Sequence, residues 1–197
     1  MGRTQQFDTA EVVRAAREVF WVNGYEASSL PALETATGLK RSSIYHAFGS
    51  KHGLFEAVIE SYLNEVIRPR LAPLVAAEVE ADALENYLTG LRAALLRTGT
   101  TAATSGCLLV NAAGAPISQD AAVASVIAAY RAELSAAFAN GVAARFPSLA
   151  NAQADVLTAA CAGLVIAAVA LVRVTPEAAV GSLDAALALI EERAVQG

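Results

Sequence analysis

The segment GLKRSSIYHAFGSKHGLF at positions 38–55 decides how the start of this chain folds. Gly38 supplies a sharp turn, and the residues after it predict a short helix with two different faces. One face is apolar and carries Ile44, Ala47 and Phe48. The opposite face is polar and carries Arg41, Ser42, Tyr45 and His46. A cation, hydroxyls and an imidazole are the groups that meet phosphates and base edges in a major groove. The pattern therefore predicts a recognition helix that binds DNA.

The residues before this segment predict two more helices. Asp8 is placed to cap a first helix, with Glu11 three residues later as the other half of a capping box. Gly24 is placed to end that helix. Ser28 and Ser29 then open a second short helix, which leads into the turn. Two helices, a sharp turn and a third helix form a helix-turn-helix unit.

A fourth helix follows directly and opens at Ser50, with Lys51 in its first turn. Backbone amides at a helix N-terminus point outward and can hold a phosphate, and the lysine adds a full charge. Both lysines of the chain, Lys40 and Lys51, lie in this N-terminal region beside Arg41. These cations strengthen the expectation of a DNA-binding surface.

Charge and length predict a small head on a larger body. Residues 1–52 hold six Arg/Lys against five Asp/Glu, whereas residues 53–197 hold eight against fourteen. A positive head can bind DNA although the whole chain carries a net charge of −5, because local charge sets the field at the contact surface. We expect residues 1–52 to form the DNA-binding domain and residues 53–197 to form the ligand-binding and dimerisation domain.

With these features, the first sixty residues resemble the DNA-binding domain of the TetR family of transcriptional regulators. The resemblance rests on the segments GYEASSLPALETATGL and KRSSIYHAFGSKHGLF. The family's frequent pattern of small, apolar, tyrosine, phenylalanine, small and lysine positions is matched by Ser43, Ile44, Tyr45, Phe48, Ser50 and Lys51. The resemblance implies that Tyr45, His46 and Lys51 contact the DNA backbone or bases.

Three residues depart from the family's pattern. Lys40 stands where a serine usually caps the recognition helix, which predicts a weaker cap. Glu34 replaces a small residue, and Ala47 replaces a common aromatic one. All three bear on base preference rather than on the phosphate contacts. The candidate DNA-contacting residues are Ser28, Ser29, Lys40, Arg41, Ser42, Ser43, Tyr45, His46 and Lys51.

The rest of the chain predicts helices only. A wide apolar stripe makes the fourth helix long, and Pro69 and Pro73 are expected to end or kink it. Further helices are expected around residues 84–95, 105–113, 123–146, 150–173 and 176–190. The predicted fold is all-α: an N-terminal three-helix helix-turn-helix domain joined by a long helix to a larger helical ligand-binding and dimerisation domain.

Polar side chains on these apolar helices are candidates for a ligand pocket. They are Tyr62, Tyr87, Cys107, Asn111, Tyr130 and Arg131. Cys107 opens a short helix, where a thiol of lowered pKa would sense oxidants or electrophiles, and the segment resembles one in TetR-like regulators with a reactive cysteine. The alternative, a small buried packing residue, is the commoner role of a free cysteine. Cys161, inside an uncharged helix, is expected to be inert.

Two helices near the C-terminus carry candidates for a homodimer interface. The first offers small residues that permit close helix approach, and the second offers an apolar seam for packing against another helix. They are Ala159, Gly163, Ala167 and Ala170 on the first and Val180, Leu183, Leu187 and Ile190 on the second. We expect a four-helix interface with twofold symmetry, which presents two heads to an inverted-repeat operator.

Several other classes of protein are disfavoured by the sequence. Two cysteines make no disulfide framework, no Cys/His spacing predicts a metal site, and no motif implies a cofactor. MGRTQQFDTA at the start has no apolar signal core, which favours a cytoplasmic location. The uncharged stretch 156–172 is near the lower length limit for a membrane span, but its many alanines favour a buried helix.

Two functions remain open on these grounds. One is a ligand-responsive DNA-binding regulator, a repressor released by an apolar or electrophilic small molecule. The other is a helical enzyme or small-molecule-binding protein whose head is purely structural. Against an enzyme, the sequence shows no inward pair of carboxylates, no nucleophile beside a base and no phosphate-binding glycine loop.

Overall fold

The structure, a computed structural model, describes residues 7–196 of the chain. Residues 1–6, which hold part of the segment used to argue against an export signal, lie outside the described residues. Within the described range the elements are all helical, and no strand occurs there. In order they are α1 (Thr9–Ala27), α2 (Leu30–Thr37), α3 (Arg41–Phe48), α4 (Lys51–Tyr62), η1 (Leu63–Ile67), α5 (Arg68–Leu71), η2 (Ala72–Leu74), α6 (Ala83–Leu96), α7 (Thr101–Ser105), α8 (Leu108–Ala113), η3 (Pro116–Gln119), α9 (Ala121–Arg145), α10 (Asn151–Leu171) and α11 (Pro176–Gln196). The all-α prediction is confirmed.

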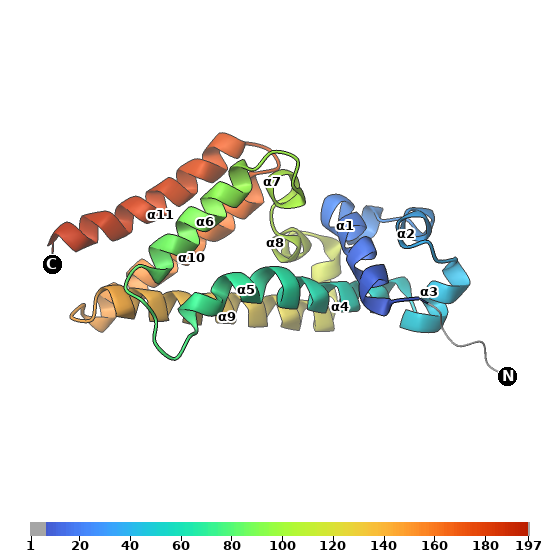
Figure 1. Cartoon of the computed structure of the whole chain (residues 1–197), viewed down its shortest axis with the longest axis horizontal. Coiled ribbons are helices and arrows are strands. Elements are labelled where there is room, and N and C mark those ends of the chain that lie inside the picture. The colour runs from blue at the N-terminus through green and yellow to red at the C-terminus, as the bar shows by residue number, and fades with distance from the viewer. Residues whose placement is uncertain (1–6, 197) are drawn as a thin grey trace.

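The head consists of α1, α2 and α3 packed against the start of α4 (Figure 1). Its helix starts are those predicted: the side chains of Asp8, Ser29 and Ser50 each accept a hydrogen bond from a backbone N–H of the following turn. Gly38 takes the left-handed conformation at φ 68° and makes the turn between α2 and α3. The head therefore presents α3 on its outer side, at the end of the molecule remote from α11.

A continuous rod joins the head to the body (Figure 1). It runs through α4, η1 and α5, and the backbone widens to π-helical hydrogen bonding over Leu63–Ile67. The widening falls just before Pro69, which has no N–H to donate to the helical ladder. The rod ends at Leu71, and Pro73 lies in the 3-10 turn that follows. Pro69 thus coincides with a change in helical hydrogen bonding, and the rod ends just before Pro73.

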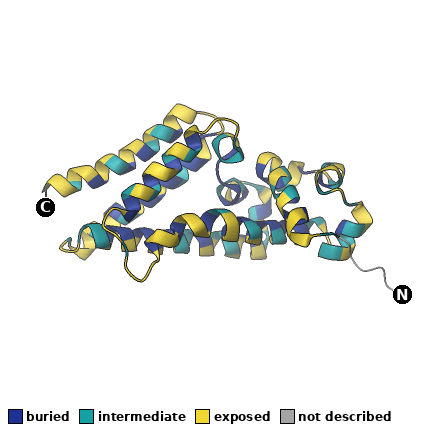
Figure 2. Cartoon of the chain, viewed as in Figure 1, coloured by how far each residue is buried: buried dark blue, intermediate teal, exposed yellow. Residues whose placement is uncertain are grey.

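The body packs α9, α10 and α11 with α6 around a buried core, and its exposed residues form the outer stripes of the helices (Figure 2). α9 runs beside the rod, and the Arg68–Glu133 ion pair at 3.2 Å joins the two. Both α9 and α10 are long and apolar enough to cross a membrane by length and composition alone. Each packs against neighbouring helices of the body on one side. The helix expected over 156–172 is therefore only partly buried: one side packs in the body, and another side, which includes Val156, is exposed.

The short helix α7 was not predicted, and it helps to hold head and body together. Five residues are too few to show a helical period in sequence. Thr101 of α7 donates to Glu18 of α1 at 2.6 Å. Just after α7, the backbone oxygen of Gly106 accepts a buried hydrogen bond from the Trp21 indole at 3.0 Å. The head is thus fastened to the body at α7 and Gly106.

Candidate DNA-binding surface and ligand pocket

The polar face of α3 is open to solvent. Arg41, Ser42 and His46 are exposed or partly exposed and Tyr45 is half-buried, while Ile44 on the opposite face is fully buried in the head core. The Arg41 guanidinium lies over the Tyr45 ring, 5.1 Å from its centre. This stacking arranges a cation and a phenol side by side on the outer surface. The two faces of the predicted recognition helix are as the sequence indicated.

The N-terminus of α3 is capped by a residue that the sequence left unexplained. Lys40 occupies the N-cap position and makes no capping hydrogen bond with its side chain, so the predicted weakness is real. The carboxylate of Glu34 on α2 replaces that cap, because it accepts from the Arg41 backbone N–H at 2.6 Å. An anion there also complements the helix dipole. Glu34 therefore stabilises the helix from the neighbouring helix rather than from the chain just before it.

Of the two serines predicted to contact DNA at the start of α2, the structure contradicts the role of Ser28. Ser28 is fully buried, and its hydroxyl donates to the Gly24 backbone oxygen at 2.6 Å. Gly24 at φ 76° breaks α1, and Ser28 satisfies the carbonyl freed by that break. Ser28 is therefore a structural residue and has no surface for DNA. Ser29 is exposed and caps α2, so it is the serine that opens this helix.

Lys51 is held against an aromatic ring. Its ammonium lies over the Tyr25 ring, 4.5 Å from the centre. Partial burial lowers the pKa of the Lys51 amine, while the nearby Glu26 carboxylate acts in the opposite direction. The contact fixes the first turn of α4 to the end of α1. It places one oriented cation near the start of α4.

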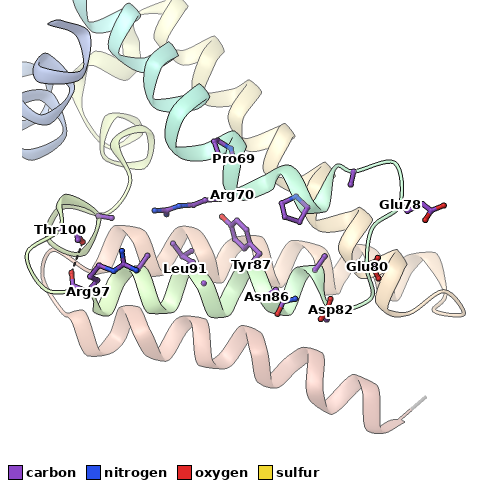
Figure 3. A pocket seen from close by; sticks show the side chains of 16 residues that line it. Pro69, Arg70, Glu78, Glu80, Asp82, Asn86, Tyr87, Leu91, Arg97 and Thr100 are labelled. Carbon is purple, nitrogen blue, oxygen red and sulfur yellow. Dashed lines mark hydrogen bonds between the residues drawn. The ribbon is translucent and has the colours of Figure 1, made fainter. Parts of the chain in front are cut away.

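A cavity of about 680 Å³ opens between the end of the rod and α6 (Figure 3). This volume is in the range of small-molecule sites. The lining residues are Pro69, Arg70, Pro73, Ala76, Glu78, Glu80, Asp82, Ala83, Asn86, Tyr87, Gly90, Leu91, Ala94, Arg97, Thr100 and Ala102. Of the six predicted pocket residues, only Tyr87 lines it. The other five belong to α4, to α8 with its N-cap, and to α9, and none of these helices contributes a residue to the cavity wall.

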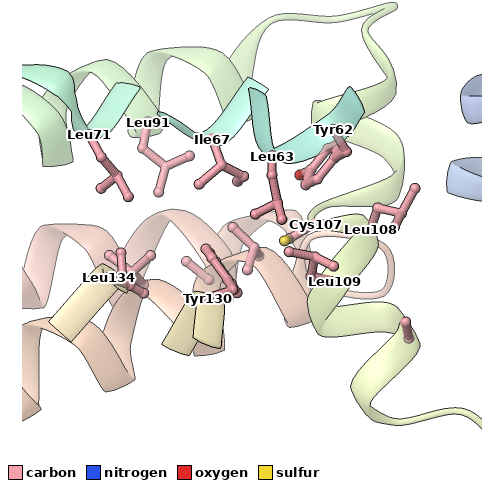
Figure 4. Close-up of a cluster of buried hydrophobic side chains, with 14 of the residues drawn as sticks. Tyr62, Leu63, Ile67, Leu71, Leu91, Cys107, Leu108, Leu109, Tyr130 and Leu134 are labelled. Atoms are coloured by element: carbon pink, nitrogen blue, oxygen red, sulfur yellow. The ribbon is translucent and has the colours of Figure 1, made fainter. Parts of the chain in front are cut away.

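A second, much smaller space of about 20 Å³ lies inward of the cavity. Tyr62, Cys107 and Tyr130 line it and pack together in the core (Figure 4). Burial, with the neighbouring Cys107, raises the pKa of both tyrosine hydroxyls. Tyr87 lines both spaces, so the two adjoin. We call this smaller space the inner chamber; it is too small to hold a ligand as it stands.

Cys107 lies at the start of a short helix, as the sequence indicated, but its side chain is buried. It occupies the N-cap position of the six-residue α8 and is 3% exposed. A reagent in solution does not reach a thiol buried to this degree. The geometry agrees with a packing residue in this conformation. Cys161 is fully buried, and burial raises the pKa of its thiol to about 11.

Asn111 and Arg131 line neither space. The Asn111 side-chain amide donates to the Ser105 backbone oxygen at 2.7 Å and braces the turn between α7 and α8. The Arg131 guanidinium hydrogen-bonds Ser135 one turn further along α9. Both polar groups therefore bond partners of their own, outside the two spaces. The residues missed were Arg70 and Arg97, whose position on a cavity wall depends on tertiary structure.

The predicted small-residue face of α10 is on the surface. Ala159, Gly163 and Ala170 are exposed, and Ala167 is half-buried. Val156 on the same helix is 69% exposed, which is unusual for a large apolar side chain. A groove of about 400 Å³ runs between α10 and α11 beside Val156. This face is apolar and has no partner in the part of the chain that the structure describes.

The predicted seam on α11 faces the other way. Leu183 and Ile190 are 0% and 1% exposed, and Val180 and Leu187 are half-buried. Their partners are α6 and α10 of the same chain. The spacing correctly indicated helix packing, but the packing is internal to the protomer. Leu183 and Ile190 therefore cannot belong to an interface between two copies.

Comparisons with known proteins agree with this geometry. The sequence model of the family described as "Bacterial regulatory proteins, tetR family" matches residues 12–58, which span most of α1 and continue into α4. YezE of Bacillus subtilis (strain 168), an uncharacterised HTH-type transcriptional regulator, is 33% identical over 146 residues, covering 72% of each chain. ComR of Escherichia coli (strain K12), an HTH-type transcriptional repressor, is 34% identical over 111 residues. That match covers 56% of this chain and 51% of ComR, so the chain spans about half the length of that relative.

A solved structure resembles almost the whole chain. It is a cysteine mutant of CifR, a TetR family transcriptional regulator, in complex with 26-base-pair operator DNA. The TM-score is 0.78 and the identity is 29%, over 94% of this chain and 98% of that one. Likeness of this extent covers both head and body, and the alternative of an enzyme with a structural head is thereby overturned. The chain belongs to the TetR family of bacterial regulatory proteins, and it is a DNA-binding regulator rather than an enzyme.

Proposed function

We propose that the protein is a cytoplasmic repressor that binds an inverted-repeat operator as a homodimer and releases it when a small molecule enters the cavity. The observation that carries this proposal is the position of the cavity. Its walls include Pro69 and Arg70 on the rod that begins in the head, and it adjoins the inner chamber, which contacts α1 through Trp21. A ligand there touches the elements that orient the head.

For DNA contact we propose the exposed side of α3 and its flanks. The residues are Ser29, Lys40, Arg41, Ser42, Ser43, Tyr45, His46 and Lys51. The open polar face and the stacked Arg41–Tyr45 pair support Arg41 and Tyr45 as base or phosphate contacts. The fixed position of Lys51 supports a phosphate contact. We assign this role to residues 1–52 and ligand binding and dimerisation to residues 53–197.

For the dimer we propose the exposed face of α10 together with the outer face of α11. Apolar surface centred on Val156 and the small residues Ala159, Gly163 and Ala170 is costly in water and permits close helix approach. Leu189, 38% exposed on α11, continues this surface across the groove. A twofold axis through such a face gives two equivalent heads, which match the two halves of an inverted repeat.

The link from cavity to head runs through Trp21. Its indole N–H donates to the Gly106 oxygen, and its ring stands edge-on to Tyr62 with centres 4.9 Å apart. Gly106 packs closely against α10: its φ is 67°, and a Cβ there would lie 1.9 Å from the Val169 oxygen, so no larger residue fits. A ligand that enlarges the inner chamber moves Tyr62, and Trp21 carries the movement to α1. Only a ligand that binds the displaced state more tightly shifts the equilibrium.

Selection from a pool of random DNA duplexes tests this proposal and assumes no operator sequence. We expect an enriched inverted repeat, and we expect Arg41→Ala to weaken its binding. Arg92→Ala is the matched control, because Arg92 pairs with Asp184 in the body and should leave binding unchanged. Enrichment of no inverted repeat by the wild-type protein would refute the proposed function.

A further inference from the structure

The charge on the cavity walls is divided between its two ends (Figure 3). Arg97 lies toward one end, with Arg70 on the wall between it and the middle. Glu78, Glu80 and Asp82 lie toward the opposite end. Leu91 and Tyr87 lie between them. The cavity is therefore cationic at one end, acidic at the other and largely apolar in the middle.

Arg70 and Arg97 differ from the other arginines of the body. Six arginines between residues 53 and 196 donate side-chain hydrogen bonds to an oxygen elsewhere in the described structure: Arg68, Arg92, Arg131, Arg145, Arg173 and Arg193. Arg70 and Arg97 make no such bond within the described residues. Both are exposed, so water solvates their guanidinium groups until an anion replaces it.

Tyr87 adds a hydroxyl near Arg70. Its ring packs edge-on to Phe138 with centres 5.1 Å apart, which holds the side chain in place. Burial raises the pKa of Tyr87 to about 12, with Arg70 acting in the opposite direction, so the hydroxyl keeps its proton and can donate. Arg70 and Tyr87 both line the cavity and the inner chamber. An anion bound by them would therefore lie next to the core that contacts Trp21.

We propose that the ligand is an amphipathic carboxylic acid, whose carboxylate binds Arg70 and Tyr87 while its apolar chain lies along Leu91; Arg97 adds positive charge to the same end of the cavity. A guanidinium is suited to this role because it binds a carboxylate through two parallel hydrogen bonds. The apolar middle of the cavity accepts the chain without unsatisfied polar groups. This inference gives the chemical class of the inducer and rests on the proposed ligand-responsive function.

Calorimetry on the DNA-free protein tests the class with three probes of equal chain length: decanoate, decanol and decylamine. We expect decanoate to bind most tightly. Arg70→Ala should weaken decanoate binding by about 10- to 100-fold, because a charge-assisted hydrogen bond is lost. It should change decanol binding little. Arg68→Ala is the matched control, two residues earlier on α5 and paired with Glu133 outside the cavity.

Three outcomes of the probe comparison, and one of the control variant, would overturn the inference. They are equal binding of decanoate and decanol, preferred binding of decylamine, and no binding of any probe. A drop with Arg68→Ala as large as with Arg70→Ala would do the same. Failure of the proposed function gives a different result, because the unliganded wild-type protein would then enrich no inverted repeat from the pool of duplexes. If the protein binds the operator but does not bind decanoate, the proposed repressor function is supported and the proposed ligand class is refuted.

Discussion

Filling the cavity from Gly90 should block the ligand site while making the protein more stable. Gly90 lies inside α6 and lines the cavity, and a Cβ built on it meets no atom within 4 Å. The backbone there is ordinary helix, so a larger residue introduces no strain. We therefore expect Gly90→Leu to project its side chain into the 680 Å³ space and occupy the middle of the site.

The magnitude follows from helix propensity. Glycine inside a helix is less favourable than a good helix former by about 1 kcal/mol. For a chain of this size, 1 kcal/mol corresponds to roughly 2–4 °C in the midpoint of thermal unfolding. Gly90→Leu should therefore raise the midpoint by about that amount. Gly90→Ala, the control, should give a similar gain and leave most of the cavity open.

The assay combines thermal unfolding, followed by circular dichroism, with decanoate calorimetry and operator binding. We expect both variants to bind the operator. Only Gly90→Leu should fail to bind decanoate and fail to release the operator when decanoate is added. A lower midpoint for both variants would mean that the cavity wall at Gly90 is not open. A stabilised Gly90→Leu protein that still binds the ligand and releases DNA would refute this cavity as the ligand site.

Three further predictions concern DNA contact, the cap of α3 and the dimer. Lys51→Ala should weaken binding to all duplexes alike and reduce the slope of log affinity against log salt by about one, and an unchanged slope would contradict a phosphate contact. Glu34→Ala should lower stability by about 1 kcal/mol in urea unfolding, since the α3 cap is lost; an unchanged midpoint would mean that the Arg41 N–H finds another acceptor. Leu183→Ala should cost about 2–5 kcal/mol and leave the dimer intact in sedimentation, because Leu183 is buried within the protomer. Gly163→Glu should instead give folded monomers, and a dimer of undiminished affinity would refute the α10 interface.

The head could be predicted well because its signals are local. Caps at Asp8, Ser29 and Ser50 act within one turn, and Gly38 acts at its own position. Ser28 misled the prediction because two adjacent serines look alike in sequence. The break of α1 at Gly24 decides which serine is buried, because it frees the Gly24 carbonyl oxygen, which accepts a hydrogen bond from the Ser28 hydroxyl. The position of a polar residue near a helix start therefore does not settle what it binds.

Partners further along the chain could not be predicted in the same way. The cap that Glu34 supplies to Arg41 spans seven residues and depends on how α2 meets α3. The α11 seam was recognised from its spacing, but spacing specifies only that an apolar face is covered. Whether Leu183 packs on its own chain or on a second copy depends on which helices the fold brings beside it.

The ligand site likewise depends on which residues the fold brings together. The sequence pointed to polar residues on apolar helices, and two of them hydrogen-bond neighbours instead: Asn111 bonds the Ser105 oxygen and Arg131 bonds Ser135. A binding group is instead one that the fold leaves without a protein partner beside an open space. Arg70 meets both conditions within the described residues, and neither is visible along the chain, since each is a property of what surrounds the residue. The carboxylate preference of Arg70 is therefore the point at which the proposed regulation is most directly tested.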